Sequence, residues 1–465
     1  MQEVSEVTKE SEYKGIWWLP DNPETRVHGS LRLVEEGLIL DLIGSFKEFF
    51  SNPEIILGFS SDGKKITLHK CFEIDSRFAI PGFQTSLFEA LEAFVGVHFQ
   101  TKDEIKFKSL SVHYSHLNLR SHLSGLCALK LPQRKGEEEL LISCKPPEVI
   151  QVDIGDYKVC LEMKLRCNFS PYEKAVDIKE KTYVTIESAE ERSFEDLKRS
   201  IKHIQDFLTL LVGQPVYPLE IEARTELSKE IMNDEVNYLP VQVYLGMSRI
   251  FGAQQFRSFY VPFNVGNIGE WFRNYLKGWF EKKESLESVY TLYLGTLYNP
   301  SMYPEQKFLS LVYAIEAYHR HFVKNCELPE VEHKRRLEEI LSASPEKHRT
   351  WLQEKLKYSN EPSLRKRLKE IMEEISKNMA LGELIPNQKI IVDDIVTTRN
   401  YLVHNDENLK EKSAKGEKLL DITEKLRTLV KICLFKELGF TPEEIKHLIG
   451  LENSNLEIDR SVNTF

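Results

Sequence analysis

The chain has little of what secreted, membrane-spanning and metal-binding proteins need. Its seven cysteines include no Cys-x2-Cys pair and no secretory framework, so reduced thiols are expected rather than a zinc site or a disulfide scaffold. No run approaches the roughly 20 apolar residues that cross a bilayer, and residues 1–6 lack the basic start of a signal peptide. We therefore expect a cytoplasmic protein with no membrane partner.

An excess of positive charge is also missing. The formal net charge is −10 at pH 7, so any nucleic-acid site must be a local basic surface on an acidic protein. What the chain does have is length and apolar content. Its 465 residues are 41% hydrophobic, which is enough to bury substantial cores in two or three domains.

The spacing of apolar residues changes near residue 285. From residue 13 to about 167, short apolar runs alternate with Gly, Asp, Asn and Pro, a pattern typical of sheets, for which a β-sandwich is the simplest arrangement. Helical spacing occurs at residues 194–212 and 269–284, and almost every later signal is helical. The sequence predicts an α+β protein, with a β-rich, sandwich-like region at 1–285 and an all-α bundle at 286–465.

Two segments imitate ligand-binding motifs. Residues 58–65 nearly match a P-loop, but Lys65 stands where a hydroxyl would hold magnesium, and Asp62-Gly63 between strand-like runs indicates a hairpin turn. His319 and His321 have the spacing of a metal pair, yet residues two apart on a helix do not face together, and no second ligand cluster is evident. We expect neither a metal ion nor a cofactor.

The most informative segment is the end of an apolar helix at residues 399–404. Arg399 lies in the middle of the apolar face formed by Ile391, Val392, Ile395, Val396, Leu402 and Val403. A buried guanidinium needs an anionic partner, such as a carboxylate, a neighbouring subunit's acid or a substrate phosphate. Arg399 and His404 point about 140° apart on a straight helix, so they converge only if the helix ends near His404 or if two helices combine. The polar segment that starts at Asn405 favours an end there.

Arginine and histidine together suit RNA cleavage without a metal ion. Histidine can move a proton from a ribose 2′-hydroxyl or to a leaving 5′-oxygen, and arginine can bind the scissile phosphate. The same pattern also fits a buried arginine bridged to an acid, with His404 merely near a helix C-terminus. Glu316 could pair with Arg399 or with Arg320, either as a structural ion pair or as support for an active site.

A basic stretch precedes this helix. Residues 324–370 carry twelve Lys or Arg against nine Asp or Glu, and Arg365, Lys366 and Arg367 are the densest part. Such a run is typical of a solvated helix face, and it is also the best candidate in the sequence for contacts to an RNA backbone.

Several segments resemble known proteins. Residues 398–405 resemble the Arg-x4-6-His motif of HEPN-domain ribonucleases, and residues 305–318 and 356–368 resemble the ApeA-like HEPN branch found in bacterial phage defence. At the other end, residues 15–21 and 27–31 resemble the start of the ApeA-type N-terminal domain.

This resemblance implies an endoribonuclease of anti-phage abortive infection that cuts host RNA by 2′-hydroxyl attack, with transfer RNA a natural candidate. His404 would be the general acid/base, Arg399 would grip the scissile phosphate, Asn400 would orient His404 or the ribose, and Glu316 would support them. The resemblance also implies at least a homodimer with a composite active site, and an N-terminal domain that senses a phage-derived trigger or restrains the nuclease. The alternative is a non-catalytic HEPN module that binds nucleotides, RNA or protein.

Overall fold

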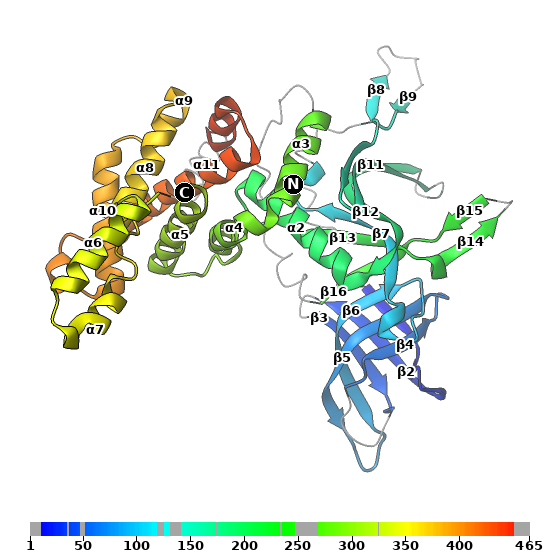
Figure 1. The fold of residues 1–465 in the computed structure, drawn as a ribbon. Helices are drawn as coiled ribbons and strands as arrows, with labels where there is room; N and C mark the ends of the chain where they lie inside the picture. Colours follow the sequence, from blue (N-terminus) through cyan, green and yellow to red (C-terminus); the bar gives the residue numbers. More distant parts are fainter. Residues whose placement is uncertain are drawn as a thin grey trace. The chain divides into compact units, whose positions relative to one another are not determined.

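The computed structural model describes most of the chain: residues 11–34, 37–46, 52–118, 125–130, 141–170, 172, 174–232, 235–246, 268–323 and 325–450. By its contacts the chain divides into two units, one of Met1–Leu208 with Val216–Lys277 and one of Thr209–Pro215 with Gly278–Phe465. Figure 1 shows the strands in the first unit and the helices α4 to α11 in the second. The domain boundary predicted at residue 285 stays a prediction.

The first unit is built on an antiparallel sheet of twelve strands (Figure 1). These strands are β1 (Ser11–Leu19), β2 (Asn22–Val34), β3 (Gly37–Ile43), β4 (Ile55–Ser60), β5 (Lys65–Arg77), β6 (Thr85–Val95), β7 (Lys106–Tyr114), β10 (Ile150–Ile154), β11 (Tyr157–Ser170), β12 (Ala175–Ser193), β13 (Pro218–Arg224) and β16 (Val241–Leu245). Two short pairs stand apart from it, β8 (Leu126–Lys130) with β9 (Leu141–Cys144) and β14 (Lys229–Met232) with β15 (Glu235–Tyr238).

Six of these strands close into a barrel, in the order β6-β3-β2-β1-β4-β5 and back to β6. The ring closes because β6 pairs with β5 along one edge, while its other edge pairs first with β3 and then with β16. The prediction of a β-rich region is confirmed, and the pairing refines the expected sandwich to a closed ring joined to an open sheet. Barrels and sandwiches both bury alternate side chains, so the sequence pattern alone does not separate them.

The barrel core is packed around Trp17, which is fully buried, as are Leu31 and Leu40. A Cβ at Gly58 would lie 2.3 Å from the Trp17 ring, so only glycine fits opposite the indole. The turn between β4 and β5 contains Gly63 at φ 83°, and it confirms the predicted hairpin in place of a P-loop.

Two helices interrupt the strand-rich part of the sequence, as predicted. The first, α2 (Phe194–Val212), begins after Ser193, whose Oγ accepts a hydrogen bond from the Asp196 N–H at 3.2 Å, and Gly213 follows its end at φ 72°. The second, α3 (Ile268–Glu281), buries Leu276 and Trp279, so part of its aromatic face is core packing.

The second unit is helical in the part that the structure describes, which confirms the predicted all-α bundle. Its helices are α4 (Lys283–Tyr298), α5 (Pro304–Tyr318), α6 (Glu330–Ala343), α7 (Glu346–Leu356), α8 (Leu364–Ser376), α9 (Met379–Gly382), α10 (Gln388–His404) and α11 (Gly416–Leu438). Helix α11 supplies much of the core, with Leu426, Leu429 and Val430 fully buried, and it contacts α4, α5 and α10.

Candidate active site

Helix α10 ends where the sequence predicted. Asn405 adopts the left-handed conformation, with φ 51° and ψ 40°, and its N–H donates to the Tyr401 carbonyl at 2.8 Å. Asparagine tolerates this conformation better than most residues, so the helix stops without strain. His404 is therefore the last helical residue, and its side chain is exposed.

The loop after α10 folds back onto the helix at Thr398. The Thr398 side chain is fully buried, and its Oγ1 accepts a hydrogen bond from the Ala414 N–H at 2.9 Å. This bond fixes the residue directly before Arg399. Sequence reasoning gave Thr398 no role, because nothing local connects it with a partner sixteen residues later.

Arg399 and His404 converge within one chain. Arg399 Nη1 lies 3.4 Å from His404 Nε2 and 3.2 Å from Asn400 Oδ1, to which it donates. Arginine can only donate, so in this contact Arg399 presents a donor to His404 Nε2. The end of the helix is thus enough to bring the pair together without a second helix.

Glu316 on α5 faces the same guanidinium. Its Oε1 lies 3.9 Å from Arg399 Nη2, and the two side chains are 22% and 23% exposed. Arg320, the other predicted partner, pairs instead with Glu361 at 2.9 Å. At 3.9 Å the Glu316 contact is electrostatic rather than a hydrogen bond. Arg399 Nε is buried and has no hydrogen-bond partner among the residues described.

The apolar face around Arg399 is only partly covered. Ile391, Val392 and Ile395 are buried as expected, but Val403 is 40% exposed. Tyr313, one helical turn before Glu316 on α5, is 42% exposed. The core of the unit therefore covers α10 up to Thr398 and leaves its last turn at the surface.

The structure corrects the expectation for one residue, Arg367, of the basic surface predicted at residues 365–367. Arg367 is 4% exposed and donates to the Pro362 carbonyl at 2.9 Å, to Glu361 at 3.0 Å and to Nδ1 of His319 at 3.2 Å. His319 is itself fully buried, and its Nε2 contacts Glu370 at 2.7 Å. Arg367 is therefore a structural residue, which the sequence concealed because one of its partners, His319, lies 48 residues earlier.

The other two residues of the triplet lie at the surface but have acidic partners. Arg365 pairs with Asp393, and Lys366 pairs with Glu327 at 3.3 Å. RNA would have to displace these carboxylates to reach either cation. Contacts from Arg365 and Lys366 to an RNA backbone remain a proposal without structural support.

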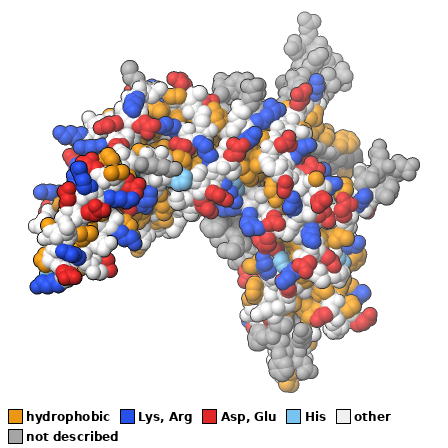
Figure 2. Space-filling model, viewed as in Figure 1, with side chains coloured by type: hydrophobic (Ala, Val, Ile, Leu, Met, Phe, Trp, Pro, Cys, Tyr) orange, Lys and Arg blue, Asp and Glu red, His pale blue; other side chains and the backbone are white. Residues whose placement is uncertain are grey.

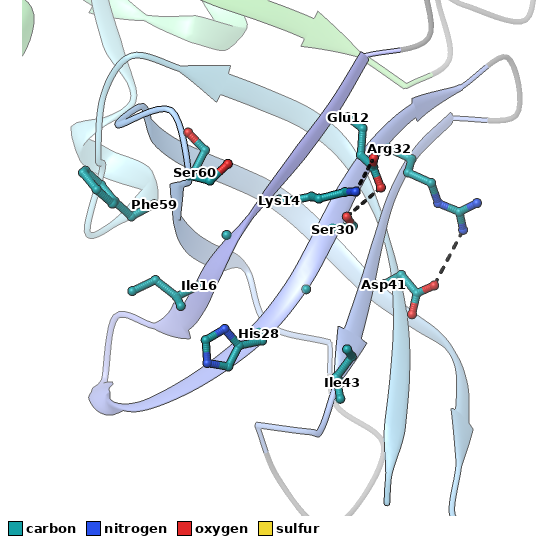
Figure 3. Close-up of a pocket in the computed structure, with 13 residues that line it drawn as sticks. Glu12, Lys14, Ile16, His28, Ser30, Arg32, Asp41, Ile43, Phe59 and Ser60 are labelled. Atoms are coloured by element: carbon teal, nitrogen blue, oxygen red, sulfur yellow. Dashed lines mark hydrogen bonds and ion pairs between the residues drawn. The ribbon is translucent and has the colours of Figure 1, made fainter.

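The first unit carries a surface depression of about 920 Å³ on the outer face of the barrel (Figure 3). Its charged side chains are paired: Glu12 accepts from Ser30 at 2.8 Å and lies 3.4 Å from Lys14, and Arg32 lies 3.8 Å from Asp41. The depression shows no convergence of unpaired catalytic groups like that at Arg399 and His404.

Comparison with known proteins gives two matches along the chain. Residues 12–279, more than half of the chain, match the family described as ApeA N-terminal domain 1, and residues 309–444, which include Arg399 and His404, match Apea-like HEPN. No curated protein and no solved structure matches significantly. Across the described residues, every helix is too short or too polar to cross a bilayer. The chain therefore belongs to the ApeA family, with an ApeA N-terminal domain 1 followed by an Apea-like HEPN domain.

Proposed function

We propose that this protein is a metal-independent endoribonuclease whose active site is formed by Arg399 and His404. An Apea-like HEPN domain in an ApeA architecture supports a nuclease-type role in abortive infection, and HEPN domains are generally ribonucleases. The observation that carries the proposal is the 3.4 Å approach of Arg399 Nη1 to His404 Nε2 at the exposed end of α10. This places a phosphate-binding group and a proton-transfer group side by side.

The proposed reaction needs only these side chains. His404 takes the proton of the ribose 2′-hydroxyl, and the 2′-oxygen forms a bond to phosphorus as the bond to the 5′-oxygen breaks. Arg399 binds the scissile phosphate and stabilises its developing charge. A protonated histidine returns a proton to the 5′-oxygen. The products are a 2′,3′-cyclic phosphate and a 5′-hydroxyl.

Asn400 and Glu316 have positioning roles in this proposal. Asn400 accepts from Arg399 at 3.2 Å, which supports a role in orienting the guanidinium beside the proposed role in orienting His404 or the ribose. Glu316 opposes the charge of Arg399 from α5 without occupying all of its donors.

We further propose that two chains combine their sites. HEPN domains typically act as dimers, and the exposed Val403 on α10 and Tyr313 on α5 give a second chain apolar surface to cover. A dimer also supplies two histidines, one as base and one as acid.

The ApeA N-terminal domain is proposed to sense a phage-derived trigger or to restrain the nuclease, because an unregulated ribonuclease would poison its host. Cells that express only residues 286–465 should then grow more slowly than cells that express the full chain. Equal growth would argue for a scaffold role.

The test of the proposed function is an RNA cleavage assay in excess EDTA. Purified protein is incubated with total cellular RNA and with transfer RNA, beside Arg399→Ala and His404→Ala. We expect wild-type cleavage and a loss of at least about 100-fold in each variant. Full activity of His404→Ala would refute the assignment, and RNA binding without cleavage would favour a non-catalytic HEPN module.

A further inference from the structure

Helices α6 and α7 form an arm, residues 329–359, that is tied together at its base. Asn360 makes the closure: its Oδ1 accepts from the Leu328 N–H at 2.9 Å, and its Nδ2 donates to the Leu328 carbonyl at 3.0 Å. The Asn360 carbonyl also accepts from the Glu327 N–H at 2.9 Å. The arm thus leaves the bundle and returns to it at one point.

The arm itself buries no residue. From residue 329 to 359 every side chain is exposed or half-buried, and α6 and α7 lack a single buried position. Elements of this kind add little to stability, because helical stability in proteins comes mostly from packing an apolar face. The side chains of the arm are therefore not required for the core and are available to bind a partner.

One face of α7 alternates lysines with aromatic residues. Lys347, Trp351, Lys355 and Tyr358 follow one another at intervals of four, four and three residues, which places them within about 80° of rotation. Helical backbone angles continue through residue 357, so Tyr358 keeps this register. Trp351 is 59% exposed and Tyr358 is 65% exposed. We call these four residues the α7 stripe.

The two lysines of the stripe have no acidic partner among the described residues. On α6, by contrast, Lys334 pairs with Glu330 at 2.7 Å and Arg335 lies 3.8 Å from Glu339. Figure 2 shows Lys and Arg side chains interspersed with acidic ones over α6 and α7. Glu354 is the acidic neighbour at the edge of the stripe. Lysines that pair with no described carboxylate therefore lie on both sides of Trp351 on α7.

We propose that the α7 stripe is the RNA-holding surface of this chain; the inference rests on the proposed ribonuclease function. Exposed aromatic rings stack on bases, and unpaired lysines attract the phosphate backbone. A protein partner fits less well, because lysine is depleted in the cores of protein interfaces. The stripe takes the place of residues 365–367, whose cations are already paired.

The test measures binding and cleavage separately. Binding of fluorescein-labelled transfer RNA is followed by anisotropy on the full chain carrying His404→Ala, in EDTA and at several salt concentrations. Adding Lys347→Glu and Lys355→Glu together should weaken binding at least about tenfold and reduce the salt slope by about 2. In a separate variant, Trp351→Ala added to the His404→Ala chain should weaken binding by about fivefold or more. The matched control is Lys334→Glu with Arg335→Glu, which makes the same change in charge on α6.

The outcomes separate this inference from the function on which it rests. Selective loss with the α7 variants supports the stripe. Unchanged binding with them, while wild type still cleaves RNA, overturns the stripe and leaves the ribonuclease standing. Equal loss with the α6 control shows an effect of net charge alone and also overturns it. A change in oligomer mass with unchanged RNA affinity assigns the arm to protein contacts, and a wild-type chain that neither binds nor cleaves RNA refutes both proposals.

Discussion

Arg399 Nη1 and His404 Nε2 lie 3.4 Å apart, although the two residues belong to opposite sides of a regular helix. The approach follows from the end of α10: Asn405 turns into the left-handed region, and His404 is the last helical residue. The geometry of the candidate active site therefore depends on two features. One is the left-handed conformation of Asn405 after His404, and the other is the hydrogen bond of Thr398, the residue before Arg399.

The left-handed conformation of Asn405 predicts opposite effects of glycine and alanine. Asn405→Ala should destabilise the protein by about 1 kcal/mol and slow RNA cleavage, because a Cβ without a polar side chain disfavours this conformation. Asn405→Gly should change the stability and the rate of RNA cleavage only a little. Urea unfolding followed by circular dichroism, together with cleavage rates, checks this, and equal behaviour of the two variants would contradict it.

The buried hydrogen bond at Thr398 predicts a second effect on stability and on RNA cleavage. Thr398→Val keeps the shape but leaves the Ala414 N–H without its acceptor, so we expect a loss of about 1–3 kcal/mol in unfolding free energy and slower cleavage. Thr398→Ser keeps the hydroxyl and should recover most of both. Serine behaving like valine would show that packing, not the hydrogen bond, fixes the helix end.

The planar guanidinium of Arg399 predicts that a positive charge alone at this position does not support full RNA cleavage. Arg399→Lys should lower cleavage by about tenfold or more, because an ammonium cannot bind a phosphate through a planar fork of donors. Arg365→Lys, at an exposed arginine paired with Asp393, is the control and should cleave normally. An active Arg399→Lys enzyme would mean that Arg399 contributes only positive charge.

The exposed last turn of α10 predicts a contact between chains. Val403→Asp should shift the protein from dimer to monomer in light scattering, because it places a charge in the proposed interface. Ile390→Asp, at the other end of α10 and 63% exposed, is the matched control and should leave the mass unchanged. Dimers that survive Val403→Asp would place the interface elsewhere.

A buried carboxylate in the first unit predicts a dependence of stability on pH. Burial alone would raise the pKa of Glu92, but hydrogen bonds with His69 at 2.7 Å and Lys198 at 2.5 Å outweigh it and lower this pKa to about 2. A depressed pKa contributes stability above the unfolded value of about 4.5, and this is lost as the pH falls towards 2.

Glu92→Gln should therefore lower the unfolding free energy by up to about 3 kcal/mol at pH 7 and by progressively less between pH 4.5 and 2. Unfolding of both proteins in urea at pH 7 and pH 3 measures this difference. A difference that is the same at both pH values would show that ionisation of Glu92 does not stabilise the fold.

Features set by neighbouring residues were accessible from the sequence. The hairpin at Gly63, the limits of α2 and the end of α10 at Asn405 each depend on turn or capping residues within a few positions. The convergence of Arg399 with His404 belongs to this class, because it needs only the helix end.

Features set by distant partners were not accessible. Closure of the barrel depends on which strands share the two edges of β6, and the burial of Arg367 depends on His319, 48 residues earlier. The arm was hidden for the opposite reason: its spacing is that of an ordinary helix pair, and only the structure shows that α6 and α7 have no buried residue.

The most direct test of the central claim is the chemistry of the RNA ends. Transfer RNA is incubated with wild type and with His404→Ala in excess EDTA, and the product ends are identified by mass spectrometry. Metal-free catalysis at Arg399 and His404 predicts 2′,3′-cyclic phosphate and 5′-hydroxyl ends from wild type and none from the variant. Products with 3′-hydroxyl and 5′-phosphate ends, or the same products from His404→Ala, would contradict it.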